Sequence, residues 1–139
     1  MPQPSTDTIA QVPLLAGLER RELERVAEAF KERRFSAGDN LATEGQKGAG
    51  FFVIGEGTAT VTVGGTERGK LGPGDYFGEI ALIDEGARMA TITAASELVC
   101  YGLTLWDFRP LVQENGKIGW KLLQALAAKL RASEQRSTA

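Results

Sequence analysis

The 139-residue sequence contains no histidine, and this absence excludes a large part of enzyme chemistry. Without histidine, Ser-His-Asp and Cys-His nucleophile systems and histidine metal sites cannot form. A single cysteine, Cys100, excludes an internal disulfide and is typical of a reducing compartment. The composition therefore argues against a metal-dependent enzyme, and we expect no bound metal.

Strong charge and long apolar runs are also lacking. The net charge is −2, so the chain has no broad basic surface of the kind that holds nucleic acid. No apolar run is long enough to cross a membrane, and the first residues have neither a basic leader nor an apolar core. We therefore expect a cytoplasmic protein that is not a membrane protein.

The length suits one globular domain. Residues 1–12 are polar and contain proline, which predicts a flexible N-terminal arm, followed by a single domain over residues 13–139. An amphipathic helix is expected over residues 14–30. Its apolar residues recur at helical spacing: Leu18, Leu23, Val26, Ala27 and Phe30.

From residue 35 the sequence is rich in glycine and in short runs typical of β-strands. Residues 58–63, "TATVTV", alternate between polar and apolar side chains, the period of a half-buried strand, and Gly64-Gly65 predicts a tight hairpin turn after it. Residues 89–104 predict two further strands with a turn near Ser96. Many short strands separated by glycine indicate a sandwich, barrel or jelly roll.

The C-terminal part is helical again. A short helix is expected from about Trp106 to Glu114, then a break at Asn115-Gly116 and a longer helix. A wide apolar stripe marks the longer helix: Ile118, Leu122, Leu126 and Leu130, with Trp120, Leu123 and Ala127 beside it. This stripe fits docking on the barrel, and it also fits a homodimer seam or a mobile lid. The nearby basic residues Lys121, Lys129, Arg131 and Arg136 are interpreted as a solvated helix face.

Between residues 72 and 92 the sequence reads "GPGDYFGEIALIDEGARMATI". A short helix starting near Gly78 would present free N–H groups, which attract anions. Arg88 is the only basic residue between Lys70 and Arg109, and its guanidinium can bind a phosphate with paired hydrogen bonds. Glu79 fits such a site only if the ligand also brings a hydroxyl. Together these residues predict a ribose phosphate ligand.

These residues resemble the phosphate-binding cassette of cyclic-nucleotide-binding domains, a family that includes catabolite activator proteins and regulatory subunits of the cAMP-dependent kinase. The family pattern F-G-E-[LI]-A-L-[LI] corresponds to residues 77–83, and R-x-A-[ST] to residues 88–91. The likeness extends over nearly the whole chain. It implies a mostly β fold, a jelly-roll-like β-roll of eight strands with an N-terminal helix, a short cassette helix and two C-terminal helices.

By this resemblance, Arg88 would pair with the cyclic phosphate and Glu79 would accept the ribose 2′-hydroxyl. The backbone N–H groups of Ala81 and Met89 would donate to the phosphate. The whole set of expected ligand-binding residues is Val61, Phe77, Gly78, Glu79, Ile80, Ala81, Arg88, Met89 and Ala90.

The remaining roles come from the same resemblance. Gly78 would leave room for the sugar, Val61 would touch the purine, and the final helix would close over the base. In relatives that prefer cGMP a threonine often follows the arginine, whereas here the residue is Met89. The predicted ligand is therefore cAMP, with cGMP the less favoured alternative. Asp84 and Glu85, near the expected phosphate, should point into solvent.

The sequence thus predicts a cyclic-nucleotide sensor, not an enzyme, which transmits occupancy through its C-terminal helices to an unidentified effector protein. No DNA-reading helix-turn-helix follows the long helix in this sequence. Two alternatives stay open. One is a ligand-independent interaction module with the same fold and a vestigial pocket. The other is a nucleotide hydrolase or small cupin enzyme, which the lack of histidine and of metal-ligand clusters disfavours.

Overall fold

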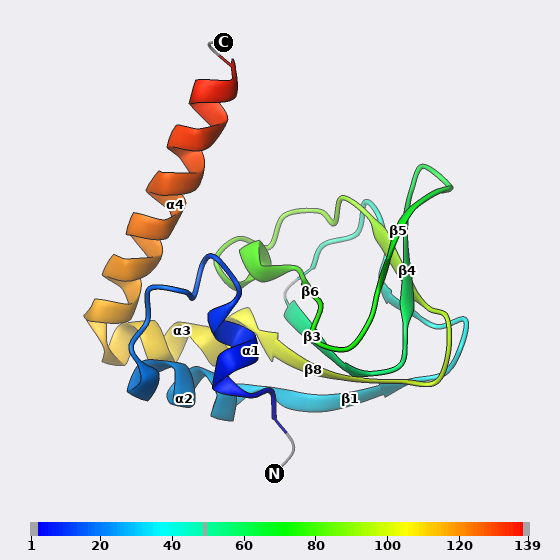
Figure 1. Ribbon diagram of the computed structural model, residues 1–139, viewed down its shortest axis with the longest axis horizontal. Coiled ribbons are helices and arrows are strands. Elements are labelled where there is room, and N and C mark those ends of the chain that lie inside the picture. The colour runs from blue at the N-terminus through cyan, green and yellow to red at the C-terminus, as the bar shows by residue number, and fades with distance from the viewer. Residues whose placement is uncertain (1–2, 49, 138–139) are drawn as a thin grey trace.

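The computed structural model describes residues 3–48 and 50–137, and it is a β-roll with helices gathered at one end (Figure 1). The eight strands form two four-stranded antiparallel sheets, in the orders β1-β8-β3-β6 and β2-β7-β4-β5. In chain order the elements are α1 (Thr6–Ala10), α2 (Arg20–Ala29), β1 (Lys31–Phe35), β2 (Asn40–Ala42), β3 (Gly50–Glu56), β4 (Ala59–Val63), β5 (Thr66–Leu71), β6 (Tyr76–Phe77), the 3₁₀ turn η1 (Glu79–Leu82), β7 (Thr91–Ala94), β8 (Leu98–Thr104), α3 (Leu105–Glu114) and α4 (Gly116–Ser137). The expected fold class, a mostly β roll with flanking helices, is confirmed.

The strand and the turn expected around residues 58–65 both form, although burial along β4 does not alternate: Ala59 is buried and the next four residues are half-buried. β4 pairs with β5 up to the Val63–Thr66 pair, and Gly64 and Gly65 between them have φ values of 59° and 81°. Consecutive positive φ values are what a two-residue hairpin turn requires, and glycine adopts them without strain. The turn near Ser96 does not form a hairpin, because β7 pairs with β4 and β8 pairs with β3. It carries the chain from one sheet to the other.

Two apolar cores divide the molecule. One lies within the roll, where Ile54, Ala59, Ile92 and Cys100 are buried between the sheets. The other lies where the helices cover the end of the roll, and it contains buried side chains of α1, α2, β3, η1, α3 and α4. Because Leu82 of η1 belongs to this second core, the cassette is packed directly against the helices.

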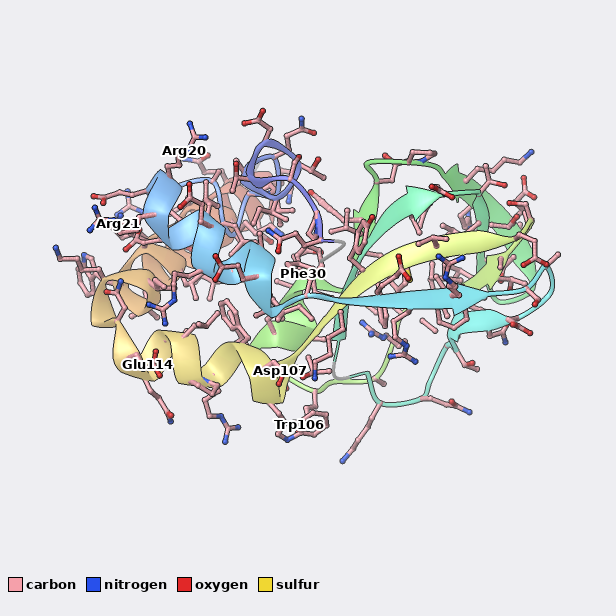
Figure 2. All side chains as sticks on the ribbon, turned by 90° about the horizontal axis from the view of Figure 1, so that it is seen from below. Arg20, Arg21, Phe30, Trp106, Asp107 and Glu114 are labelled. Carbon is pink, nitrogen blue, oxygen red and sulfur yellow. The ribbon has the colours of Figure 1, made fainter. Side chains whose placement is uncertain are left out.

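The N-terminal expectations need two corrections. Residues 6–10 form helix α1 in place of a loose arm, since Ser5 caps it and Ile9 and Val12 are buried under the helices; residues 1–2 lie outside the described part. α2 begins at Arg20 and not at residue 14. There Glu19 and Glu22 form a capping box, each side chain accepting the other's backbone N–H. α2 ends at Ala29, and Figure 2 shows the next residue, Phe30, where the helices meet the roll.

The C-terminal helices break where expected. α3 ends at Glu114, and the break contains Asn115, whose N–H still donates to the carbonyl oxygen of Leu111. In Figure 1, α4 starts against the helical core and its C-terminal turns extend away from it. The predicted docking of its stripe holds for Ile118 and Leu122, which are buried, but Leu130 is 60% exposed. No helix within the described residues is both long enough and apolar enough to cross a membrane.

Candidate functional site

The site is built on the short loop that follows β6. Gly78 has φ 83°, a left-handed conformation that L side chains rarely adopt, and it turns the chain into the single 3₁₀ turn η1. A Cβ atom at Gly78 would collide with Nη1 of Arg88 and would lie 2.6 Å from the carbonyl oxygen of Gly50. Glycine is therefore required both by the backbone and by the close approach of the arginine.

Arg88 lies at the centre of this arrangement. Its Nη2 donates a hydrogen bond of 2.6 Å to the carbonyl oxygen of Gly50, and its Cζ lies 5.9 Å from the centroid of the Phe77 ring. The side chain also packs against Gly48, where a Cβ atom would collide with it. Burial lowers the pKa of this guanidinium from its ordinary value, but arginine stays charged. The site thus holds a positioned, partly buried cation.

Glu79, the first residue of η1, supplies the opposite charge. Its side chain is 21% exposed, and its Oε1 lies 3.7 Å from Nζ of Lys129 on α4. Burial raises the pKa of Tyr76, and the nearby carboxylate of Glu79 raises it further. Glu79 therefore places a carboxylate at the start of η1, with a lysine from the last helix beside it.

The main chain of η1 is less open than the sequence predicted. The N–H of Ala81, expected to donate to a phosphate, donates to the carbonyl oxygen of Gly78 at 3.0 Å. This is the i to i−3 bond of a 3₁₀ turn. A ligand that used this N–H would have to share or open that bond.

A cavity of about 390 Å³ opens in front of these groups. Its lining residues are Ala42, Phe77, Gly78, Glu79, Ile80, Ala81, Asp84, Gly86, Ala87, Arg88, Met89, Ala90 and Ile92. Eight of the nine sequence-predicted residues are among them. The ninth, Val61, is half-buried on β4 opposite Ile92 of β7, and it packs into the core of the roll outside the cavity lining.

The loop residues beyond η1 lie as the sequence suggested, with one addition. Met89 is 87% exposed, so its side chain does not fill the cavity. Asp84 and Glu85 are both exposed, as expected. Asp84 nevertheless lines the cavity, which places a second carboxylate at the edge of the site.

Two observations bear on chemistry other than binding. Cys100 is buried in the roll, and burial raises the pKa of its thiol to about 11 while Arg33 opposes this shift. A thiol with that pKa stays protonated and is a poor nucleophile at neutral pH. Across residues 3–48 and 50–137, no three His, Cys, Asp or Glu side chains gather in a group that could hold a metal ion.

Comparison with known proteins agrees with the fold. The sequence profile of the family described as "Cyclic nucleotide-binding domain" matches residues 32–115, which is more than half of the chain. A cAMP-dependent protein kinase regulatory subunit from Mycosarcoma maydis is 40% identical over 91 residues, which are 63% of this chain. The chain covers only 17% of that relative's length.

Solved structures give the same result over most of the chain. The N-terminal domain of a transcriptional regulator from Streptomyces coelicolor A3(2) has a TM-score of 0.85 and 27% identity, covering 94% of this chain and 95% of that one. A cyclic nucleotide-binding-like protein from Brucella abortus has a TM-score of 0.72 and 25% identity, covering 78% and 97%. The catabolite activator protein of Thermus thermophilus has a TM-score of 0.67 and 28% identity, covering 91% and 62%.

A roll whose short turn places a carboxylate and a positioned arginine around one cavity defines a class of ligand-binding regulatory domains. The chain belongs to the cyclic nucleotide-binding domain family.

Asp84, expected near the phosphate and in solvent, is exposed and also lines the cavity. The contact of Lys129 with Glu79 was not anticipated, because Lys129 was interpreted as part of a solvated helix face. The spacing of charges along α4 gives no signal for this contact. It depends on the direction in which α4 leaves the core, and that direction is set by packing at the start of the helix.

Proposed function

We propose that this chain is a cyclic-nucleotide sensor which binds cAMP in the cavity in front of η1. The observation that carries the proposal is the arrangement of Arg88 and Glu79 around one cavity of about 390 Å³. A guanidinium matches a phosphodiester and a carboxylate matches a ribose hydroxyl. An ion pair between Glu79 and Arg88 does not explain this arrangement, because the ion-pair partner of Glu79 is Lys129 of α4.

The arginine can serve a phosphate without losing its present contact. Guanidinium carries five N–H donors, and Nη2 uses one of them on the carbonyl oxygen of Gly50. That bond, together with the face of Phe77, fixes the orientation of the guanidinium before a ligand arrives. A preorganised cation loses less conformational entropy on binding than a free one, which favours affinity.

We propose that η1 is the moving part. A phosphate that takes the N–H of Ala81 disturbs its bond to Gly78, and Leu82 and Ile83 follow in the chain. Both of these side chains line a second, apolar hollow of about 550 Å³ against α3 and α4, whose other lining residues include Phe108, Trp120 and Leu126. A shift of η1 therefore changes the surface against which α4 packs. The ligand biases this equilibrium only by its difference in affinity between the two states.

The preference for cAMP over cGMP is also part of this proposal. The side chain after Arg88 is Met89, which has no hydroxyl to contact a guanine and is almost fully exposed. One of the relatives above is named as a cAMP-dependent kinase regulatory subunit, which agrees with this choice. The output, the effector protein, a homodimer through α4 and a cytoplasmic location all stay predictions from the sequence.

Calorimetric titration of nucleotide-stripped protein with cAMP and then cGMP tests the proposal. We expect micromolar or tighter binding of cAMP and weaker binding of cGMP. Arg88→Gln should weaken cAMP binding by about 100-fold, because it removes one partner of a partly buried charge pair. Arg68→Gln, at an exposed position of β5, makes the same charge change away from the cavity and should bind as wild type does.

Folding controls keep this test decisive. The thermal unfolding of each variant is compared with that of wild type. Glu79→Gln should independently weaken cAMP binding by about tenfold, because it removes the carboxylate that accepts the ribose hydroxyl. If wild type gives neither heat nor a thermal shift with either nucleotide, the sensor proposal is wrong. The cassette would then have a structural role, and the ligand-independent interaction module would replace it.

A further inference from the structure

The last helix contributes a charged side chain to the edge of the candidate site. Nζ of Lys129 lies 3.7 Å from Oε1 of Glu79, and the two side chains are 49% and 21% exposed. Lys129 is not part of the cavity lining, so it reaches the site through the carboxylate. Its contact joins the second half of α4 to η1, the turn that lies between α4 and the strands in Figure 1.

Lys129 changes the sum of the formal charges around the cavity. The lining contains one cation, Arg88, and two carboxylates, Glu79 and Asp84, so its formal charge is −1. A phosphodiester is also an anion and would meet a net repulsion there. With Lys129 beside Glu79, the sum becomes zero. The lysine thus removes the electrostatic obstacle that the hydroxyl-accepting carboxylate creates.

Occupancy of the cavity should strengthen this contact. Water still reaches Glu79, and exposed ion pairs are weak because solvent screens them. A nucleotide seated over Glu79 would exclude that water, and a buried carboxylate is unfavourable unless a cation accompanies it. Carboxylates accept on both oxygens, so Lys129 at Oε1 and a ribose hydroxyl at the second oxygen can be held together.

We propose that Lys129 is a positioning residue of the nucleotide site, acting through Glu79, and that its contact couples occupancy to the docking of the second half of α4. The inference rests on the proposed function. Coupling of this kind is reciprocal. If the ligand strengthens the contact between Lys129 and Glu79, that contact tightens the ligand to the same extent.

The test compares cAMP affinities by calorimetry for wild type and three variants. Lys129→Gln should weaken binding by about three- to tenfold, in the range of a partly desolvated ion pair. Lys129→Arg should restore affinity to within about twofold, because it keeps the charge. Arg131→Gln makes the same charge change at an exposed position two residues further along α4, and should bind as wild type does.

A second readout separates this role from a merely structural one. Hydrogen exchange of residues 126–136 is followed with and without cAMP, since an ordered helix end exchanges more slowly. Nucleotide should protect these amides in wild type and in Arg131→Gln. In Lys129→Gln at saturating cAMP the protection should be lost.

The outcomes distinguish the two claims. If wild type binds cAMP but Lys129→Gln binds equally well or more tightly, or keeps the protection, then the positioning role is wrong while the sensor proposal stands. If Lys129→Gln and Arg131→Gln weaken binding equally, the effect is net charge alone, and the contact with Glu79 is not its cause. If wild type binds no nucleotide, the proposed function fails and this inference fails with it.

Discussion

The two halves of α4 differ in how they are held, although they belong to one continuous helix. In the first half, Ile118 and Leu122 are buried, and Nζ of Lys121 lies 2.8 Å from Oε1 of Glu22 on α2. In the second half, Leu130 is exposed, and Lys129 makes a longer, more solvated contact with Glu79. The helix is therefore anchored at its start and weakly attached where Lys129 meets Glu79.

The anchor in the first half of α4 is a buried polar network around Glu22. Glu22 is the only charged side chain among the buried residues of the described chain, and it accepts hydrogen bonds from Lys121, Asn115 and the N–H of Glu19. These bonds fix the corner between α3 and α4 against α2. A contact as exposed as that of Lys129 is worth at most about 1 kcal/mol, which a ligand can readily change.

The largest effect should come from the apolar anchor. Leu122→Ala removes a buried side chain from the helical core and should lower the free energy of unfolding by about 3 kcal/mol. Leu130→Ala, about two turns further along the same helix, should change it by less than about 0.5 kcal/mol because this leucine is exposed. Urea unfolding of both variants measures the contrast. Equal losses would mean that α4 is held evenly along its length.

A smaller effect is expected at the polar anchor. Glu22→Gln removes the charge that Lys121 pairs with and should destabilise the fold by about 2 kcal/mol. Glu24→Gln, on the exposed side of α2, loses only an i,i+4 contact with Arg20 and should cost at most about 0.5 kcal/mol. Urea unfolding measures both. A cost at Glu22 no larger than at Glu24 would show that the buried network does not anchor α4.

The contribution of Glu22 to stability should also depend on pH, and this effect should be the smallest of the three. Burial raises the pKa of Glu22, but hydrogen bonds from Lys121 and from the N–H of Glu19 lower it, so the net pKa lies below its ordinary value of 4.5. Its contribution to stability is therefore present above the pKa of the unfolded chain, and it is lost as pH falls through the folded-state pKa.

Urea unfolding of wild type and Glu22→Gln from neutral pH down to about pH 3 tests this sign. The stability difference between the two proteins should shrink as the solution becomes more acidic. A difference that stays constant across this range would mean that the Glu22 carboxylate is not stabilised by its charge.

The sequence was sufficient for those parts of the fold that depend on local pattern. The strand over residues 59–63, the two-glycine turn and the break at Asn115 each have a local cause, and each lies where expected. Residues 6–10 were missed because five residues of helix carry too short a period to recognise. The start of α2 was placed too early because Leu14 and Leu15 are buried in turns, so their apolar character mimicked a helical stripe.

The part of the candidate site whose residues lie close together in the sequence could be predicted. Gly78, Glu79 and Arg88 lie within eleven residues, and the loop itself brings them around one cavity. The engaged N–H of Ala81 and the reach of Lys129 could not be predicted. The first depends on the type of turn, and the second on the angle at which α4 leaves the helical core.

The most direct test of the account is to follow the backbone amide NMR shifts of α4 as cAMP is added to the nucleotide-stripped protein. We expect small changes for residues 118–122, which are anchored to α2 and the helical core. We expect larger changes for residues 126–136, which include Lys129 and its contact with Glu79 of η1. Unchanged shifts in both segments, with cAMP demonstrably bound, would contradict the claim that α4 transmits occupancy of the site.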